Sequence, residues 1–189
     1  MNLFKRLSRP ATIALVTLLS VNLTLIAAYT AGLRINRTAS MPEGLYRIVA
    51  YHAGPIARGT VVVVCPSANV LALAAPRHYL DPGPCPGNVE PLLKHVAAIA
   101  GDEVELSEGA VSVDGAALEQ SGRLARDCAG RPLSRIPAGR YRIANGTVWL
   151  YAPVARSWDS RYFGPQPASG IVGIAQPVLI VGTGQACAS

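Results

Sequence analysis

The chain has 189 residues, half of them hydrophobic, and a formal net charge of +6. This length accommodates one ordinary domain with a core beside a membrane segment. A positive net charge can indicate a nucleic-acid partner, but from Thr38 onward twelve basic residues are balanced by eleven acidic ones. The positive excess flanks an uncharged N-terminal stretch, as is typical of a membrane anchor, so we expect no nucleic-acid partner.

The uncharged stretch runs from Arg9 to Arg34. Roughly 20 apolar residues, at about 1.5 Å each, cross the ~30 Å hydrocarbon core of a bilayer. We therefore predict a transmembrane anchor at 10–33. Basic residues at the N-terminus favour a cytoplasmic segment at 1–9 and a body at 34–189 on the outer side of the membrane. A cleaved signal peptide is the alternative, since small residues near the end of the stretch offer a cleavage site.

The body has the pattern of many short strands joined by tight turns. Runs of β-branched and aromatic residues between Gly, Pro and Asn predict strands. These strands are expected at 45–51, 60–65, 92–100, 103–106, 110–113, 140–143 and 147–151, with a last strand pair within 171–181. We expect the strand at 92–100 to be buried on both faces. Little helix and many strands predict an all-β sandwich or barrel-like body.

Turns and loops are also marked in the sequence. Hairpins are expected around 107–109, at Asp114-Gly115 and at Asn145-Gly146. A short helix at 67–75 would begin at Ser67 as its N-cap. Pro- and Gly-rich residues 81–88, and the Arg- and Pro-rich residues 122–139, are predicted loops.

Four cysteines, at positions 65, 85, 128 and 187, contain no C-x-x-C pair, so we expect no zinc site. Disulfides are permitted if the body lies outside the cytoplasm. Cys85 and Cys128 both lie in predicted loops that need tethering, which favours this pair among the three possible connectivities. No motif indicates any other metal or a cofactor.

Ser40 and Lys94 are the candidate reactive pair. Ser40 closely follows the anchor, and Lys94 is the one lysine of the body, where every other basic residue is arginine. Arginine stays protonated, whereas a lysine buried among apolar residues can lose its proton. A neutral amine beside a hydroxyl could act as the base of a Ser/Lys dyad. His95 is not expected to be that base, because adjacent strand residues point to opposite faces.

Residues 157–164 gather a hydroxyl, a carboxylate and a guanidinium in one short segment. We expect Asp159 and Arg161 to form an ion pair that holds this loop, while Ser157 points its hydroxyl toward Lys94.

Two features have open interpretations. The arginines of 122–139 could face lipid headgroups, although a solvated loop is favoured. Trp158 could join Tyr29 in an aromatic belt at the membrane interface. Trp149 is expected in the core instead.

Three motifs together resemble the successive catalytic boxes of the signal peptidase I family of Ser/Lys proteases. They are Ser40-Met41-Pro42, Lys94 in an apolar strand that ends at Gly101-Asp102, and the box from Ser157 to Gly164, which is the most specific. Within that family, the short form with one anchor is similar to the TraF group of conjugative-transfer peptidases. The resemblance implies a mainly β, signal-peptidase/LexA-like catalytic domain with one N-terminal transmembrane helix.

The resemblance also implies roles for individual residues. It assigns catalytic roles to Ser40, Lys94 and Asp159, oxyanion or orienting roles to Thr38, Ser157 and Arg161, and substrate binding to Met41 and Pro42. Ser40 would be the acylated nucleophile and Lys94 its general base. The Ser40 amide and the Thr38 hydroxyl would form the oxyanion hole.

The implied function is that of a serine endopeptidase in a bacterial inner membrane, single-pass, with its catalytic domain in the periplasm. It would mature a conjugative pilin precursor to a linear or cyclic product, with other transfer-apparatus proteins as further partners. A general type I signal peptidase acting on preproteins is the first alternative. The Gly-Asp-Asn-type box and large second domain of housekeeping signal peptidases are absent, which favours a dedicated substrate. An inactive anchored assembly module of a transfer apparatus is the second alternative.

Overall fold

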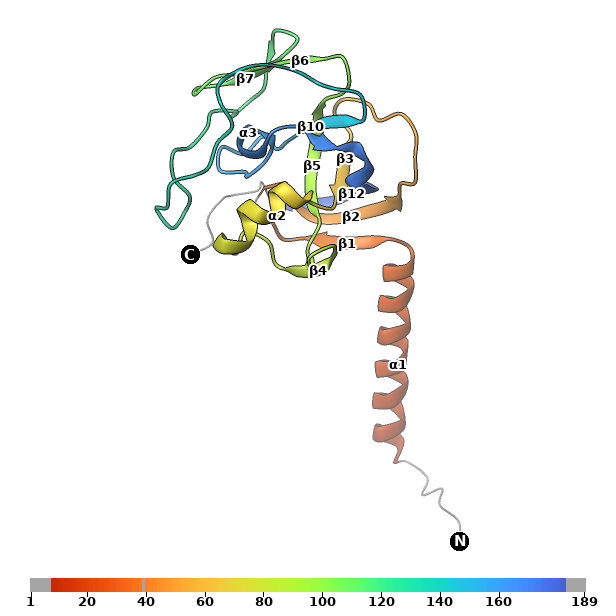
Figure 1. The fold of residues 1–189 in the computed structure, drawn as a ribbon. Helices are drawn as coiled ribbons and strands as arrows, with labels where there is room; N and C mark the ends of the chain where they lie inside the picture. Colours follow the sequence, from red (N-terminus) through yellow and green to blue (C-terminus); the bar gives the residue numbers. More distant parts are fainter. Residues whose placement is uncertain (1–7, 39, 183–189) are drawn as a thin grey trace.

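A single apolar helix extends from a β-rich body (Figure 1). The computed structural model describes residues 8–38 and 40–182. Helix α1, Arg9–Thr30, has proline in its first turn and no buried residue, and it is long and apolar enough to cross a membrane. It ends three residues before the predicted anchor does, because strand β1 begins at Leu33.

The larger sheet has seven antiparallel strands in the order β1-β2-β12-β3-β5-β10-β11. Their bounds are β1 Leu33–Asn36, β2 Glu43–Ala50, β12 Ile171–Gly182, β3 Val61–Val64, β5 Leu92–Ala98, β10 Thr147–Tyr151 and β11 Gln166–Pro167. The predicted strand pair within 171–181 is wrong, because β12 is one continuous strand that takes Pro177 at a register shift in its pairing with β2.

The smaller sheet has the order β8-β7-β6-β9 and lies at the end of the body farthest from α1 (Figure 1). Its strands are β6 Glu103–Leu106, β7 Val111–Val113, β8 Ala116–Ala117 and β9 Gly139–Arg142. The hairpins predicted at 107–109 and Asp114-Gly115 are confirmed. The hairpin predicted at Asn145-Gly146 is wrong, because β9 pairs with β6 while β10 pairs with β5 in the other sheet.

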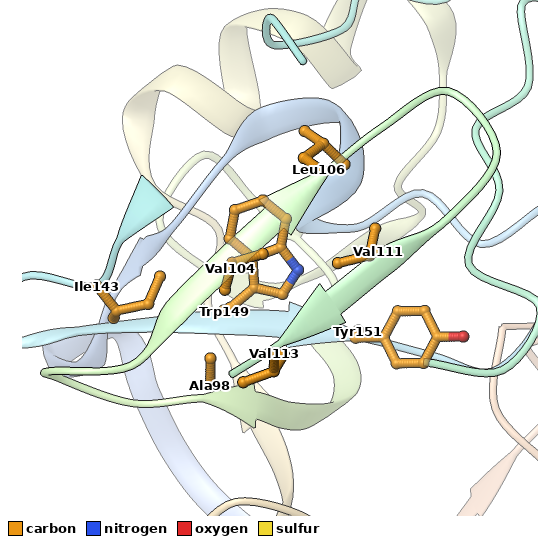
Figure 2. Close-up of a cluster of buried hydrophobic side chains, with 8 residues drawn as sticks. All are labelled: Ala98, Val104, Leu106, Val111, Val113, Ile143, Trp149 and Tyr151. Carbon is orange, nitrogen blue, oxygen red and sulfur yellow. The ribbon is translucent and has the colours of Figure 1, made fainter. Parts of the chain in front are cut away.

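Trp149 lies fully buried in the core between the two sheets, as predicted (Figure 2). This cluster comprises Ala98, Val104, Leu106, Val111, Val113, Ile143, Trp149 and Tyr151. A second cluster lies on the other side of β10 and includes Val148 and Leu150. Strand β10 is therefore the strand buried on both faces. The same prediction for the strand at 92–100 is wrong, since buried and half-buried residues alternate along β5.

The remaining elements are short. They are α2 Ala68–Ala74, η1 Ala75–Arg77, β4 Pro82–Cys85, α3 Ser160–Phe163 and η2 Ala168–Gly170. The helix predicted at 67–75 is confirmed, but the hydroxyl of Ser67 donates to the side chain of Gln166 instead of capping it. The segment 81–88 is not entirely loop, because β4 bridges back to Val89.

A disulfide joins Cys65, which directly follows β3, to Cys85 at the end of β4, with their Cα atoms 5.4 Å apart. The predicted pairing of Cys85 with Cys128 is therefore wrong. The reason is that β4 folds back beside the β3 end, an arrangement that loop composition alone does not reveal. Cys187 lies outside the described residues.

Candidate active site

Lys94 is buried in β5, on the same face of the strand as Val96 and Ala98, and only 2% of it is exposed. Its Nζ donates a hydrogen bond to Oγ of Ser157 over 2.9 Å. Burial lowers the pKa of Lys94 to about 8, because the charged form loses its hydration. The carboxylate of Asp159 opposes this pKa shift and the guanidinium of Arg161 adds to it. At this pKa roughly a tenth of the molecules carry a neutral amine at pH 7, against fewer than about one in a thousand at the ordinary value of 10.5.

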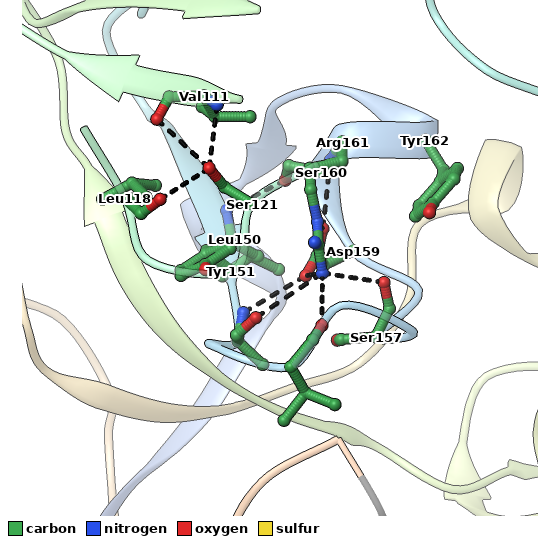
Figure 3. Close-up of polar contacts among 12 residues, drawn as sticks. Val111, Leu118, Ser121, Leu150, Tyr151, Ser157, Asp159, Ser160, Arg161 and Tyr162 are labelled. Atoms are coloured by element: carbon green, nitrogen blue, oxygen red, sulfur yellow. Dashed lines mark hydrogen bonds and ion pairs between the residues drawn. The ribbon is translucent and has the colours of Figure 1, made fainter. Parts of the chain in front are cut away.

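A buried ion pair fixes the loop that holds Ser157 (Figure 3). Arg161 donates from Nε to Oδ1 of Asp159 over 2.8 Å and from Nη2 to Oδ2 over 2.9 Å. Neither side chain is exposed. Such a bidentate ion pair offsets the free-energy cost of burying both charges only if the other hydrogen-bond donors of Arg161 and acceptors of Asp159 are also satisfied.

Those remaining groups find backbone partners. Arg161 also donates to the carbonyl oxygens of Gln120, Gly122, Val154 and Ser157. Asp159 accepts from the backbone amides of Ala152 and Arg161. Because Arg161 bonds the carbonyl of Ser157 itself over 3.0 Å, the ion pair sets the position of the residue that contacts Lys94.

Local sequence explains why this loop folds as it does. Asp159 is the N-cap of α3 and accepts from the Arg161 amide, while Gly164 ends the helix with a φ of 78° that favours glycine. The hydroxyl of Ser160 accepts from the backbone amide of Leu150 over 2.9 Å, which attaches α3 to β10. Sequence reasoning gave Ser160 no role, although the residue lies inside the predicted box.

Ser40 is half-buried in the connection between β1 and β2. Asn36, the last residue of β1, organises this connection. Its Oδ1 accepts from the Thr38 amide and hydroxyl, and its Nδ2 donates to the carbonyl oxygens of Met41 and Pro42 over 3.2 and 3.0 Å. Sequence reasoning gave Asn36 no organising role. The signal that could have indicated this role is that an asparagine in a turn often bonds the backbone two residues further along the chain.

The neighbours of Ser40 have defined positions as well. The Thr38 hydroxyl donates to Asn36 over 2.7 Å, so it must leave this bond before it can donate to a substrate oxygen. Met41 is 1% exposed as a whole residue, so neither its side chain nor its backbone is open to a substrate in this conformation. The carbonyl oxygen of Pro42 accepts from the hydroxyl of Tyr46 over 2.8 Å, which ties the segment to β2.

A cleft of about 660 Å³ lies between the Ser40 segment and β5. Thr38, two residues before Ser40, and Leu93, next to Lys94, both line it. Leu93 points to the opposite face of β5 from Lys94, and neither Ser40 nor Lys94 lines this cleft. The sequence-predicted residues therefore form two groups, one around Ser40 and one around Lys94, that this cleft does not join. Among the described residues no hydrogen bond joins Ser40 to Lys94. Catalytic hydrogen bonds are often long in structures without substrate and tighten when substrate binds.

His95 points to the other face of β5, with its Nδ1 3.3 Å from the carbonyl oxygen of Gly59. Trp158 packs edge-on against Tyr79 and Phe163 beside the site loop, with ring centroids 5.2 and 5.0 Å apart. Within residues 8–38 and 40–182, no cluster of His, Cys, Asp and Glu could hold a metal ion.

The chain is similar along most of its length to proteins of one family. The profile of the family described as "Signal peptidase, peptidase S26" matches residues 5–180. A probable conjugal transfer protein TraF of Sinorhizobium fredii is 41% identical over 177 residues, which cover 93% of this chain and 92% of the relative. A plasmid transfer protein TraF of Escherichia coli is 38% identical over 155 residues, which cover 81% and 86%.

Among solved structures, a signal peptidase I of Enterococcus faecalis aligns with a TM-score of 0.35 at 17% identity, over 65% of this chain and 98% of that chain. The family profile covers almost the whole sequence, so the predicted resemblance is confirmed at the level of the family. The chain belongs to the signal peptidase family, peptidase S26.

Proposed function

We propose that the chain is a membrane-anchored serine endopeptidase in which Ser40 is the nucleophile and Lys94 its general base. The observation that carries this proposal is the buried amine of Lys94, which donates to Ser157 and has a pKa lowered to about 8. An amine of this kind is rare in a structural role, since burying a lysine without a carboxylate partner is costly. The free-energy cost of burying Lys94 is explained if the enzyme needs the neutral amine as a base.

The chemistry would proceed through an acyl-enzyme. Oγ of Ser40 attacks the scissile carbonyl while its proton passes to Nζ of Lys94. Collapse of the tetrahedral intermediate breaks the peptide bond, and Lys94 returns the proton to the leaving amine. Water, or an amine of the substrate, then attacks the ester, Lys94 accepts the proton of that nucleophile, and Ser40 regains its hydrogen.

The surrounding residues would support these steps. The Ser40 amide and, once released from Asn36, the Thr38 hydroxyl would donate to the oxyanion. Ser157 would orient the Lys94 amine. Asp159 acts on Lys94 through its charge, since its two oxygens already bond Arg161 and backbone amides, so we assign it a positioning role.

Helix α1 would anchor the enzyme in the inner membrane of a bacterium, with the body in the periplasm. The Cys65–Cys85 disulfide agrees with an oxidising compartment, since disulfides rarely persist in the cytosol. Arg34, just after α1, stacks its guanidinium 3.6 Å over the ring of Tyr29, an arrangement suited to the interface between lipid and water.

The relatives named as conjugal or plasmid transfer proteins suggest the substrate class. We propose that the enzyme matures a conjugative pilin precursor and works beside other proteins of a transfer apparatus. A general signal peptidase would instead process many unrelated preproteins, so substrate breadth separates these functions. An inactive assembly module would process none.

The test is processing of the propilin by the full-length chain in membranes. Ser40→Ala and Lys94→Ala should each abolish processing while the protein accumulates at the wild-type level. Lys94→Arg keeps the charge and reach of the side chain but cannot deprotonate, so it should be as inactive as Lys94→Ala. Unchanged processing by Ser40→Ala would overturn the proposal. Mass spectrometry of the product distinguishes a linear pilin from a cyclic one.

A further inference from the structure

A second cleft, of about 320 Å³, has Arg156, Trp158 and Tyr162 of the site loop in its lining. Three segments that are distant in the sequence line it: residues 77–79 after α2, residues 124–133, and residues 156–162. Its charged lining residues are Arg77, Arg126, Arg131 and Arg156, with one acidic residue, Asp127. We call this site the arginine cleft. The proposed peptidase chemistry uses none of these five side chains.

Asp127 neutralises only part of this charge. It accepts from the Tyr79 hydroxyl over 2.6 Å and from Nε of Arg131 over 2.7 Å, while Arg77 lies 3.5 Å away. The Tyr79 hydrogen bond, above all, holds the pKa of Asp127 well below its ordinary value, so this carboxylate stays ionised. One carboxylate beside the three guanidinium groups of Arg77, Arg126 and Arg131 leaves this part of the arginine cleft positive.

Arg126 carries charge that the cleft itself does not balance. Its Nη1 donates to the neutral carbonyl oxygen of Gly130 over 2.7 Å. Among residues 8–38 and 40–182, no ion pair involves Arg126. Guanidinium groups suit phosphate because their planar donors match its oxygens. An anionic group is therefore the ligand that this lining favours.

Aromatic side chains also line the arginine cleft. Trp158 and Tyr79 both line the cleft and contact each other edge to face. Tryptophan and tyrosine are enriched where lipid headgroups meet acyl chains, because each ring has an apolar body and a polar tip. Arginines beside these rings are typical of surfaces that bind anionic headgroups.

The position of the cleft agrees with such a surface. In Figure 1, α2 (yellow) lies in the lower part of the body, the end from which α1 leaves at the right, and it runs down to the left; η1 follows directly after it in the chain. The connection between β8 and β9, residues 118–138, descends along the left edge of the body toward the same lower end. The smaller sheet lies at the opposite end.

We propose that the arginine cleft binds the phosphate headgroup of an anionic phospholipid in the membrane that holds α1. Ser157 lies between Arg156 and Trp158, which both line the cleft, so a bound headgroup would also steady the residue that contacts Lys94. The proposal rests on the membrane anchoring proposed above, but not on peptidase activity.

Trp158 provides a reporter, since the chain has only one other tryptophan, the buried Trp149. The full-length chain is reconstituted in phosphatidylcholine vesicles that contain increasing fractions of phosphatidylglycerol, and tryptophan emission is recorded. We expect a saturable change in emission that Trp158→Phe abolishes. Arg126→Gln should raise the phosphatidylglycerol fraction at half-saturation about fivefold, and Arg126→Lys much less.

The matched control is Arg140→Gln, which removes an exposed arginine of β9 at the far end of the body and should leave the titration unchanged. Thermal melting verifies that each variant is folded. Flotation with phosphatidylcholine vesicles alone tests the anchor, so failure of the anchor is recognised separately. No emission change with phosphatidylglycerol, or equal shifts for Arg126→Gln and Arg140→Gln, would overturn the proposal. So would an equal emission change caused by soluble glycerol phosphate, because that outcome assigns the cleft to a free anion.

Discussion

The amine of Lys94 donates to the hydroxyl of Ser157 over 2.9 Å, across a sequence separation of 63 residues. A neutral amine has two hydrogens and one lone pair. If one hydrogen is directed to Ser157, the orientation of the lone pair is restricted, which is what a general base requires. The bond also depends on the Asp159–Arg161 pair, because Arg161 holds the carbonyl of Ser157.

Removal of this hydroxyl should impair the base without unfolding the protein. Ser157→Ala leaves a buried amine without its acceptor, at a cost of about 1–3 kcal/mol, so we expect processing about 10- to 100-fold slower. Ser157→Thr restores a hydroxyl and should recover much of the rate. Single-turnover processing of the propilin measures both variants. Equal rates for Ser157→Ala and the wild type would show that this bond does not position the base.

Processing should depend on pH through the neutral fraction of Lys94. Because its pKa is about 8, the rate should rise tenfold per pH unit well below pH 8 and become constant above it. Initial rates between pH 5 and pH 10 in phosphatidylcholine vesicles would test this dependence. A rate that keeps rising toward pH 10 would contradict a base with a lowered pKa.

Lys94 should also make stability depend on pH. Its pKa is about 8 in the folded protein and 10.5 as the ordinary value, so between these pH values the unfolded chain binds more protons. The free energy of unfolding should therefore rise with pH across this window, by roughly 3 kcal/mol in total. Lys94→Met, which fills a similar volume without an amine, should lack this rise. If the free energy of unfolding changed with pH in the same way in Lys94→Met and in the wild type, the prediction would be contradicted.

Asp159→Asn separates the two effects of the buried ion pair. The variant leaves Arg161 as an uncompensated buried charge, so we expect a loss of about 3–5 kcal/mol of stability. It also removes the carboxylate that raises the pKa of Lys94, so the rising part of the pH profile should move to lower pH. If Asp159 only stabilised the fold, Asp159→Asn would lower the melting temperature without shifting the pH profile of processing.

Asn36 should matter for activity more than for stability. Asn36→Ala removes the bonds that organise the Ser40 segment, and small misplacements of a nucleophile can cost about 100-fold in rate. Asn36→Asp keeps the acceptor for Thr38 but loses the donor to Met41 and Pro42, so it should be intermediate. If Asn36→Ala processed the propilin at the wild-type rate, Asn36 would have no role in positioning the Ser40 segment.

The sequence predicted those parts of the fold that depend on local pattern. The alternation in 103–106 and 110–113, with a short turn between them, is sufficient to predict the β6–β7 hairpin. The strands before and after Asn145-Gly146 carry the same kind of signal, yet they belong to different sheets. The sheet to which each strand belongs is determined by pairing of β10 with β5 and of β9 with β6. These long-range contacts cannot be recognised from the residues of the turn.

The candidate site was predictable where chemistry requires a particular residue type. A lone lysine among arginines drew attention to Lys94, and the structure buries it against Ser157. The role of Asn36 was not predicted, because the hydrogen bonds of its side chain depend on the conformation of the Ser40 segment. The Cys65–Cys85 pairing likewise depends on how β4 folds back.

The most direct test of the account is the pKa of Lys94 itself. The chain has only two lysines, Lys5 and Lys94, so NMR of the full-length chain with isotope-labelled lysine gives two side-chain signals. Lys94→Arg identifies the signal of Lys94 by its loss. The account predicts that the Lys94 signal titrates near pH 8, well below the ordinary lysine pKa of 10.5. A Lys94 signal that titrates at or above this ordinary value would contradict a Ser/Lys mechanism.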